Sequence, residues 1–236
     1  MGRKDNYEKS VNDIVFRTLD TRRGYLIPTT DTVKLSNGGV WVDAVYLYTD
    51  MADSTGLAKK HSKTTAAQIV RAFLATITRV IRDNGGEIRS YDGDRVMAIY
   101  VGDEAATKAG KTALEIKWVV DNVIEPGVSL ALDEYDRSSW KLSHRTGIDM
   151  GEALIVRAGV RDNNDLVSIG DAPNIAAKLS DLRGARTFIT DRVWDAMSAE
   201  YCFYDSKWVW SDAAPTDIGG GRVEKVRTSS WGWVVS

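Results

Sequence analysis

The chain has little of several things that would define a protein class. Its 236 residues include one cysteine, two histidines and four prolines. The single cysteine, Cys202, excludes an intramolecular disulfide and a cysteine-rich metal cage, and it favours a reducing compartment. No apolar run approaches the length of a membrane span, and the polar start MGRKDNYEKS lacks the apolar stretch of a secretion signal. These absences predict a cytoplasmic protein with no membrane partner.

An excess of charge of one sign is also lacking. The 31 Lys and Arg residues nearly balance the 33 Asp and Glu residues, which gives a net charge of −2. Such a surface offers no general attraction to a polyanion, so we expect no nucleic-acid partner. With 43% hydrophobic residues, the chain has material for one sizeable core. We expect an N-terminal helix or arm over residues 1–38 and one principal domain over residues 39–236.

Apolar periodicity and turn residues outline the elements of that domain. Residues 6–19 predict a helix with one apolar stripe, which we expect to pack on the domain or on a partner chain. The expected elements that follow are, in chain order, a strand over 40–49, a helix over 58–83, a hairpin of strands over 87–91 and 95–101, a helix over 104–123, and strands over 141–150 and 152–160 that join through Gly151. A short helix with Asp171 as its N-cap is expected later in the chain.

The order strand, helix, strand, strand, helix, strand predicts the fold class. It is the ferredoxin-like βαββαβ arrangement, an α+β fold in which helices cover an antiparallel sheet. The tail from Tyr201 alternates polar and apolar residues and contains four of the eight tryptophans. We expect this tail to be a C-terminal β extension that covers an edge of the sheet. The fold alone does not determine a function.

Two carboxylates stand at strand ends in this scheme. Asp50 ends the strand over 40–49, and Asp94 precedes the strand over 95–101. If those strands are neighbours, both carboxylates lie at one end of the sheet, and such a pair suits Mg²⁺ or Mn²⁺. The polar loop Met51-Ala52-Asp53-Ser54-Thr55-Gly56 follows Asp50 and precedes a helix N-terminus, where backbone N–H groups favour phosphate. The loop lacks the lysine of a P-loop.

Four segments in this order resemble the class III nucleotidyl cyclases. VYLYTDMADSTGL and GGEIRSYDGDRVMAIY resemble the two metal-binding segments of that family. HRTGIDMGEALIV resembles its Arg-x-Gly-Ile-x-x-Gly-Glu strand pair, and IGDAPNIAAKLSDL resembles its asparagine-bearing helix. The resemblance covers residues 40 to about 190 and implies a class III cyclase catalytic domain.

The resemblance implies roles for single residues. Two divalent cations, Mg²⁺ or Mn²⁺, would be held by Asp50, Asp94 and the carbonyl of Met51. The substrate is a nucleoside triphosphate whose ribose 3′ oxygen attacks the α-phosphate and releases pyrophosphate. Its other contacts would come from the backbone N–H groups of Ser54 and Thr55 for the triphosphate, from Arg145 for a phosphate, from Asn174 for the ribose, and from Lys178 for the charge on the reacting phosphate.

Lys178 departs from the family pattern, in which this position is usually arginine. Lysine keeps the positive charge but loses the two-pronged geometry of a guanidinium group, so we expect a looser contact. In the family the metal carboxylates and the Asn/Arg pair meet only across a head-to-tail dimer. The resemblance therefore implies a homodimer with two composite sites. Each site would take Asp50, Asp94 and Arg145 from one subunit and Asn174 and Lys178 from the other.

The base-reading positions depart from both purine patterns. Adenylate-forming members use Lys and Asp there, and guanylate-forming members use Glu with a small polar residue, whereas this chain has Ser90 and Val167. Tyr48 and Arg95 flank the two carboxylates and would crowd a purine, so a tighter pyrimidine pocket is expected. This pattern is similar to the pyrimidine cyclases of the bacterial Pycsar antiphage system. Arginine donors favour the two carbonyl oxygens of uracil, which points to UTP over CTP.

That resemblance implies a cyclic pyrimidine monophosphate that activates a separate effector in antiphage defence. Three alternatives stay open on the sequence. The chain could be an adenylate cyclase with a divergent base pocket, or a catalytically inactive cyclase-like domain that senses nucleotides. It could also be an unrelated ferredoxin-like polymerase or diguanylate cyclase, although the hairpin reads YDGDR and lacks the GGDEF-like signature.

Overall fold

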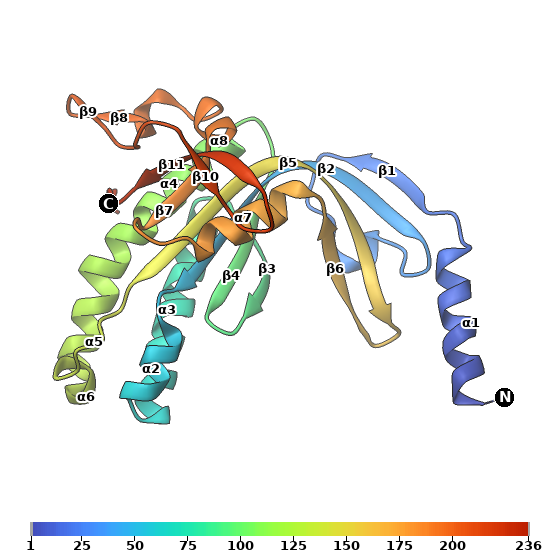
Figure 1. The fold of residues 1–236 in the computed structure, drawn as a ribbon, viewed down its shortest axis with the longest axis horizontal. Helices are drawn as coiled ribbons and strands as arrows, with labels where there is room; N and C mark the ends of the chain where they lie inside the picture. The colour runs from blue at the N-terminus through green and yellow to red at the C-terminus, as the bar shows by residue number, and fades with distance from the viewer. Residues whose placement is uncertain (1, 236) are drawn as a thin grey trace.

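The computed structural model describes residues 2–235 (Figure 1). Its helices are α1 (Arg3–Val15), α2 (Ser54–Lys60), α3 (Lys63–Asp83), α4 (Ala105–Val119), the π-helical η2 (Val120–Ile124), α5 (Glu125–Ala131), α6 (Asp133–Asp136), α7 (Asp171–Asp181) and α8 (Asp191–Asp195), with the short 3₁₀ turns η1 (Thr30–Thr32) and η3 (Ala199–Tyr201). Its strands are β1 (Asp20–Gly24), β2 (Gly38–Met51), β3 (Glu87–Asp92), β4 (Arg95–Tyr100), β5 (His144–Val160), β6 (Asn163–Ile169), β7 (Thr187–Thr190), β8 (Phe203–Tyr204), β9 (Lys207–Trp208), β10 (Ala214–Asp217) and β11 (Val223–Ser229).

One large sheet organises the molecule. Its strands run in the order β10-β11-β7-β5-β2-β4-β3, while β1 pairs with β2 and β6 pairs with β5. The central pairs β2–β5, β2–β4 and β3–β4 are antiparallel, and β5–β7 is parallel. The predicted ferredoxin-like α+β fold is confirmed. No described helix is both long enough and apolar enough to cross a bilayer.

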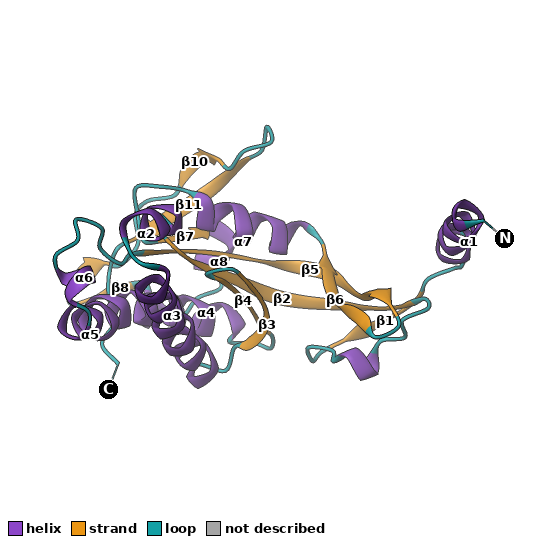
Figure 2. Cartoon of the chain, turned by 90° about the horizontal axis from the view of Figure 1, so that it is seen from below, coloured by secondary structure: helices purple, strands orange, loops and turns teal. Residues whose placement is uncertain are grey.

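The two faces of the sheet bury different helices, because successive side chains of a strand point to opposite faces. Val45 and Leu47 of β2 pack into the main core with α3 and α4. Ala44 and Tyr46, the alternating residues, pack in a second cluster with Ala172 of α7. Figure 2 shows α7 on one side of the sheet and α3 and α4 on the other. Helix α7 is therefore the element that covers the Asp50 face of β2.

Gly147 lets α7 lie directly on β5. A Cβ atom at this position would meet the Ala176 carbonyl oxygen at 2.2 Å and the Ser180 nitrogen at 2.4 Å. Both contacts are shorter than atoms tolerate, and both involve backbone that cannot rotate away. The glycine of the HRTGIDMGE segment thus sets the height of α7 above the sheet.

Three expected elements differ from the structure. The helix predicted over 58–83 is two helices, because His61 is extended and Ser62 caps α3 by accepting a hydrogen bond from the Thr65 N–H at 3.2 Å. The strands predicted over 141–150 and 152–160 are one strand, β5, which pairs with β2 without interruption through Gly151. Strand β6 was not predicted. It returns along the distal half of β5.

Helix α1 lies away from the body of the molecule (Figure 1). It has no buried residue, and Val11, Ile14 and Val15 of its apolar stripe are each more than half exposed. The expectation that this helix packs on its own domain is wrong, because β1 pairs with the first residues of β2 at the far end of the sheet and leaves α1 beyond that end (Figure 1). Packing on a partner chain and the division at residue 38 stay predictions.

The C-terminal tail extends the sheet as expected. Strand β11 pairs with β7, and β10 forms the outermost strand beside it. Trp210 is buried in the main core, whereas Trp208 on the small β8–β9 hairpin is largely exposed. Asp171 is the first residue of α7 rather than its N-cap, which is Gly170. This difference follows from the extended backbone of Gly170, which places the cap one residue earlier.

A buried ion pair joins the central strand to the C-terminal part of the sheet. Asp149 of β5 is fully buried. Its Oδ1 accepts a hydrogen bond from Arg192 Nε at 2.8 Å and another from the Thr190 hydroxyl, and its carboxylate forms an ion pair with the Arg192 guanidinium. Burial raises the pKa of the Asp149 carboxyl, while Arg192 and Thr190 act to lower it. Arg192 also contacts Glu224 of β11 at 3.5 Å. The pair therefore stabilises the packing of α8 against β5 and β11.

Replacing Arg192 by alanine should leave the Asp149 carboxylate buried and unpaired. Because Arg192 is only half-buried, we expect the lower end of the usual cost, about 3 kcal/mol of unfolding free energy. The raised pKa means that the folded state favours neutral Asp149, so stability falls as the pH rises above the ordinary range of an aspartate. Urea unfolding should show a larger loss near pH 7 than near pH 4. Equal losses at both pH values would contradict this account, and Arg161→Ala in the exposed β5–β6 turn is the control.

Candidate active site

The two predicted metal carboxylates converge at one end of the sheet. Asp50 is the second-last residue of β2, and Asp94 immediately precedes β4. Strands β2 and β4 are antiparallel neighbours with Thr49 opposite Val96, so both carboxylates lie at the same end. Burial raises the pKa of Asp50, and the Asp94 carboxylate raises it further. The mutual repulsion of the two groups makes this point of the fold attractive to a cation.

The donor atoms fit a divalent cation that keeps most of its coordination open. Oδ2 of Asp94 is buried and has no hydrogen-bond partner in the protein. A buried carboxylate oxygen without a partner is costly unless another group satisfies it. Across residues 2–235 no group of three or more His, Cys, Asp or Glu side chains could hold a metal by itself. Two carboxylates and a backbone carbonyl are the sparse set that leaves positions for phosphate oxygens.

Arg95 occupies the space between acidic groups from two elements. Its guanidinium lies 3.2 Å from Asp50 Oδ2 and also pairs with the Asp181 carboxylate at the C-terminal end of α7. Asp181 was not predicted, because nothing in the sequence shows that α7 ends above β4. Tyr48 lies two residues before Asp50 on the same face of β2 and is partly buried. Arg95 acts to lower the pKa of the Tyr48 hydroxyl, although burial raises it more strongly.

The loop after Asp50 is held in a fixed conformation. Asp53 adopts a left-handed backbone, with φ of 57°, and its Oδ1 accepts the Gly56 N–H at 3.1 Å. The Trp140 indole donates to the Asp53 carbonyl at 2.9 Å, and the Ala52 N–H donates to Ser143 at 2.8 Å. Ser54 and Thr55 begin α2, and first-turn N–H groups have no acceptor within their own helix. The loop thus presents backbone donors beside the carboxylates.

Arg145 lies on the strand next to Asp50. The β2–β5 register places Arg145 directly opposite Asp50, and directly opposed residues point to the same face of a sheet. Its guanidinium donates to the Asp181 carbonyl at 3.3 Å. The predicted phosphate contact is therefore adjacent to the predicted metal ligands within one chain.

Asn174 and Lys178 lie one turn apart on α7. The Asn174 amide donates to the Gly170 carbonyl at 2.9 Å, and the Lys178 ammonium donates to the Gly219 carbonyl at 3.0 Å. The first hydrogen bond goes to the N-cap residue of α7 itself and the second to the β10–β11 turn, and neither goes to Asp50 or Asp94. Within the single chain, the structure groups Asp50, Met51, Asp94 and Arg145 and gives Asn174 and Lys178 other partners.

The two base-reading positions lie on separate strands. Ser90 sits at an irregularity of β3, where the register with β4 shifts, and it is exposed. Val167 lies on β6 and is 45% exposed. Neither side chain carries a charge or an amide that could recognise a purine edge. The larger groups near the carboxylates are Tyr48 and Arg95.

Comparison with known proteins agrees with the resemblance to the class III nucleotidyl cyclases. No protein-family model matches the chain. Over 197 residues it is 41% identical to a uridylate cyclase of Rhodovulum sp. (strain MB263), covering 83% of this chain and 82% of the relative. Over 234 residues it is 32% identical to a uridylate cyclase of Xanthomonas perforans, covering 99% of both chains.

Solved structures of lower identity share the fold. The adenylyl cyclase CyaB from P. aeruginosa superposes with a TM-score of 0.64 at 16% identity, over 81% of this chain and 95% of that chain. The guanylyl cyclase Cya2 superposes with a TM-score of 0.66 at 16% identity, over 81% and 92% of the two chains. Proteins with different base preferences therefore share this fold. The fold does not distinguish cyclases by their base, whereas the sequence relatives are uridylate cyclases. On the basis of these relatives, the chain belongs to the uridylate cyclase family of class III nucleotidyl cyclases.

Proposed function

We propose that this protein converts UTP to 3′,5′-cyclic UMP and pyrophosphate, with CTP as a second substrate. The observation that supports it best is the pair of carboxylates at the end of β2 and β4, with Tyr48 and Arg95 in the space beside them. The carboxylates suit a metal-dependent reaction of a triphosphate, and the bulky neighbours reduce the room for a base. The relatives named uridylate cyclase support the same choice of substrate.

Asp50, Asp94 and the Met51 carbonyl would hold two divalent cations, Mg²⁺ or Mn²⁺. When bound, these ions would supply charge neutralisation at the phosphates and at the attacking oxygen. The chain's own residues would mainly position the substrate. The N–H groups of Ser54 and Thr55 and the Arg145 guanidinium would hold the phosphates in line with the ribose, so that the protein contributes orientation and electrostatic stabilisation.

Asn174 and Lys178 would complete the site from a second copy of the chain. Asn174 would orient the ribose, and Lys178 would stabilise charge on the reacting phosphate. In support, both side chains bind backbone oxygens within their own chain and leave the carboxylates without amide or lysine partners. The exposed apolar stripe of α1 is a further surface that a homodimer would bury.

Arg95 and Tyr48 would select the base. Arg95 has several N–H donors, which match the two carbonyl oxygens of uracil better than the amino group of cytosine. In this structure its guanidinium contacts Asp50 and Asp181, which places it beside the proposed metal ligands. Ser90 and Val167 would line the outer part of the pocket without reading a purine.

The product would act as a second messenger that activates a separate effector in antiphage defence, as in the Pycsar system that the chain resembles. This step of the proposal is tested by adding the purified cyclic product to candidate effectors.

Incubation of the purified protein with ATP, GTP, CTP and UTP separately, each with Mn²⁺, tests the proposed reaction. We expect cyclic UMP as the main product, identified by mass, with a smaller amount of cyclic CMP. Cyclic AMP as the main product would instead indicate an adenylate cyclase with a divergent base pocket. If the protein binds the nucleotides but forms no product from any of them, it is a nucleotide sensor. Arg95→Ala should lower the preference for UTP over CTP, because it removes the donors that read uracil.

A further inference from the structure

The loop between Asp50 and α2 is held by a tryptophan from a distant part of the chain. The Trp140 indole N–H donates to the Asp53 carbonyl at 2.9 Å, across 87 residues of sequence. The same carbonyl accepts the Leu57 N–H at 3.1 Å, which begins the hydrogen bonding of α2. One backbone oxygen thus ties the loop, the start of α2 and the Trp140 side chain together.

The conformation of Asp53 needs this support. Its backbone is left-handed, with φ of 57° and ψ of 46°, a region that residues with a side chain disfavour. Its Oδ1 accepts the Gly56 N–H at 3.1 Å, and a Cβ atom at Gly56 would meet Asp53 Oδ2 at 2.1 Å. The absence of a side chain at Gly56 therefore lets the carboxylate fold over the first turn of α2. The loop is held from within by the Asp53 side chain and from outside by Trp140.

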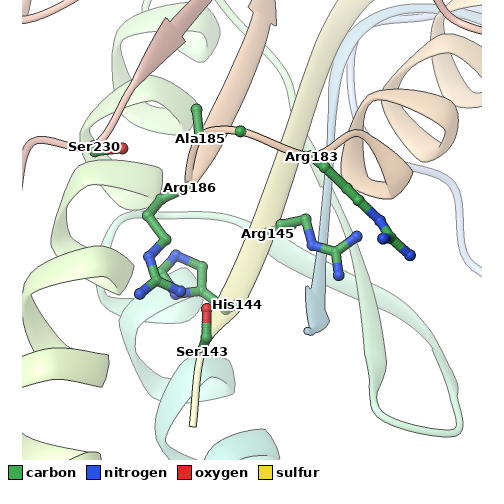
Figure 3. A pocket seen from close by; sticks show the side chains of 8 residues that line it. Ser143, His144, Arg145, Arg183, Ala185, Arg186 and Ser230 are labelled. Carbon is green, nitrogen blue, oxygen red and sulfur yellow. The ribbon is translucent and has the colours of Figure 1, made fainter. Parts of the chain in front are cut away.

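Strand pairing brings Trp140 to the loop. The β2–β5 register ends with Met51 opposite His144, and the Ala52 N–H still donates to the Ser143 carbonyl at 2.8 Å. One residue farther along, the loop is contacted by the Trp140 side chain rather than by backbone. Figure 3 shows Ser143 where its segment enters β5, and Arg145 farther along the strand. The segment that carries Trp140 therefore runs directly into the strand of the proposed phosphate contact.

Packing fixes the position of the Trp140 indole. Trp140 is 5% exposed and belongs to the main core. Its ring lies edge-on to His61, with centroids 5.8 Å apart, and to Tyr135, with centroids 6.2 Å apart. Tyr135 is fully buried, and its hydroxyl accepts the Leu142 N–H at 2.8 Å. Because aromatic contacts from two sides hold the indole, its N–H is aimed before any substrate binds.

The residues that follow Asp53 are the proposed phosphate donors. Ser54 and Thr55 open α2, and their N–H groups have no acceptor within that helix. The direction of these N–H groups follows the backbone of Asp53, because they belong to the next two residues. Donors that are already in place need no ordering when a triphosphate binds, whereas donors on a loose loop add that cost to binding.

We propose that Trp140 is a positioning residue for the triphosphate. Its hydrogen bond to the Asp53 carbonyl keeps the N–H groups of Ser54 and Thr55 directed at the phosphate oxygens. This proposal rests on the proposed cyclase reaction and adds to it a residue that does not touch the substrate. Because the loop holds the phosphates both before and during the reaction, the effect of Trp140 falls on substrate affinity more than on kcat.

Trp140→Phe removes the N–H donor and keeps an aromatic ring in the core. With UTP and Mn²⁺, its KM should rise about tenfold while kcat stays within about threefold. Product inhibition by pyrophosphate should weaken by the same factor, whereas inhibition by uridine, which has no phosphate, should not change. Trp210→Phe is the matched control, because the Trp210 indole is 4% exposed and donates to the Tyr201 carbonyl at 2.9 Å, away from the loop. Its KM should equal that of the unaltered protein.

Hydrogen exchange measures the order of the loop without turnover. The Gly56 and Leu57 N–H groups both donate to Asp53, so their exchange reports whether that residue is held. Both amides should exchange faster in Trp140→Phe than in the unaltered protein or in Trp210→Phe. If the two phenylalanine variants lost equal thermal stability and had the same KM and the same loop exchange, Trp140 would be a core residue only, and the proposal would be wrong.

A second variant keeps the test decisive if Trp140→Phe does not fold. Gly56→Ala displaces the Asp53 carboxylate and leaves the aromatic contacts of Trp140 in place, so it should also raise the KM for UTP. An unchanged KM despite faster loop exchange would overturn the proposal.

Calorimetric binding of UTP separates this proposal from the proposed function. If the unaltered protein formed no cyclic nucleotide but bound UTP about tenfold more tightly than Trp140→Phe, the positioning role would stand while the cyclase reaction would not. If it formed cyclic UMP and both phenylalanine variants had its KM, the reaction would stand and the positioning role would not.

Discussion

Alanine at Asp50 or at Asp94 is expected to abolish cyclase activity while leaving a folded dimer. Both carboxylates are partly buried at the ends of β2 and β4, and each would supply oxygen ligands that the other groups of the site cannot replace. We expect a loss of at least about a thousandfold in kcat for either variant. Folding should survive, because removing one of two mutually repelling carboxylates does not open the apolar core.

Product formation from UTP with Mn²⁺ measures the effect, and gel filtration with circular dichroism checks the fold. Asp92→Ala is a matched control, because Asp92 ends β3 in the same hairpin and is exposed to solvent. Its activity should stay within about twofold of the unaltered protein, as is usual for an exposed residue away from a site. Full activity of Asp50→Ala or Asp94→Ala would remove the two-metal assignment.

Mixing two inactive variants should restore activity if the site is shared between subunits. An Asp94→Ala chain retains Asn174, and an Asn174→Ala chain retains Asp94. A heterodimer of the two has one site that carries both substitutions and one site that carries neither. After random exchange, about half of the dimers are heterodimers with one intact site, so about one quarter of the full activity should return.

The same mixture should stay inactive if the site is not shared between subunits. If Asp94 and Asn174 acted within one chain, every site in the heterodimer would carry a substitution and no activity would return. Each variant carries a different affinity tag, and purification over both tags verifies that heterodimers are present. A verified heterodimer without activity would contradict the shared site.

Local signals in the sequence predicted many of the elements around the site. The alternating residues of VWVDAVYLYT predicted β2, and the Asp92-Gly93-Asp94 turn predicted the β3–β4 hairpin; both are confirmed. The break between α2 and α3 was missed because a helical periodicity runs across His61 and Ser62. Two contacts of Ser62 hold the break: its hydroxyl accepts from the Thr65 N–H, and its own N–H donates to Glu134 of α6 at 2.6 Å. A partner so far along the chain leaves no local signal.

Gly151 led to a similar error for the longest strand. A glycine between two apolar runs predicts a turn, because glycine favours turns and weakens strands. The structure instead keeps one strand, because β2 supplies a continuous row of partners from Gly39 to Met51. Strand pairing between distant segments outweighed the local preference.

The sequence by itself determined the family, the fold class and the identity of the residues proposed for the metal and phosphate sites, because each of these rests on residue types at short spacings. Only the tertiary structure decided which of them lie together. Asp50 meets Arg145 through the β2–β5 register, and Arg95 meets Asp181 because α7 ends above β4. The connection from α7 to β7 lies beside the start of β5 only because β7 pairs in parallel with β5. Contacts between residues so distant in the chain depend on strand register and helix packing, which short sequence patterns do not encode.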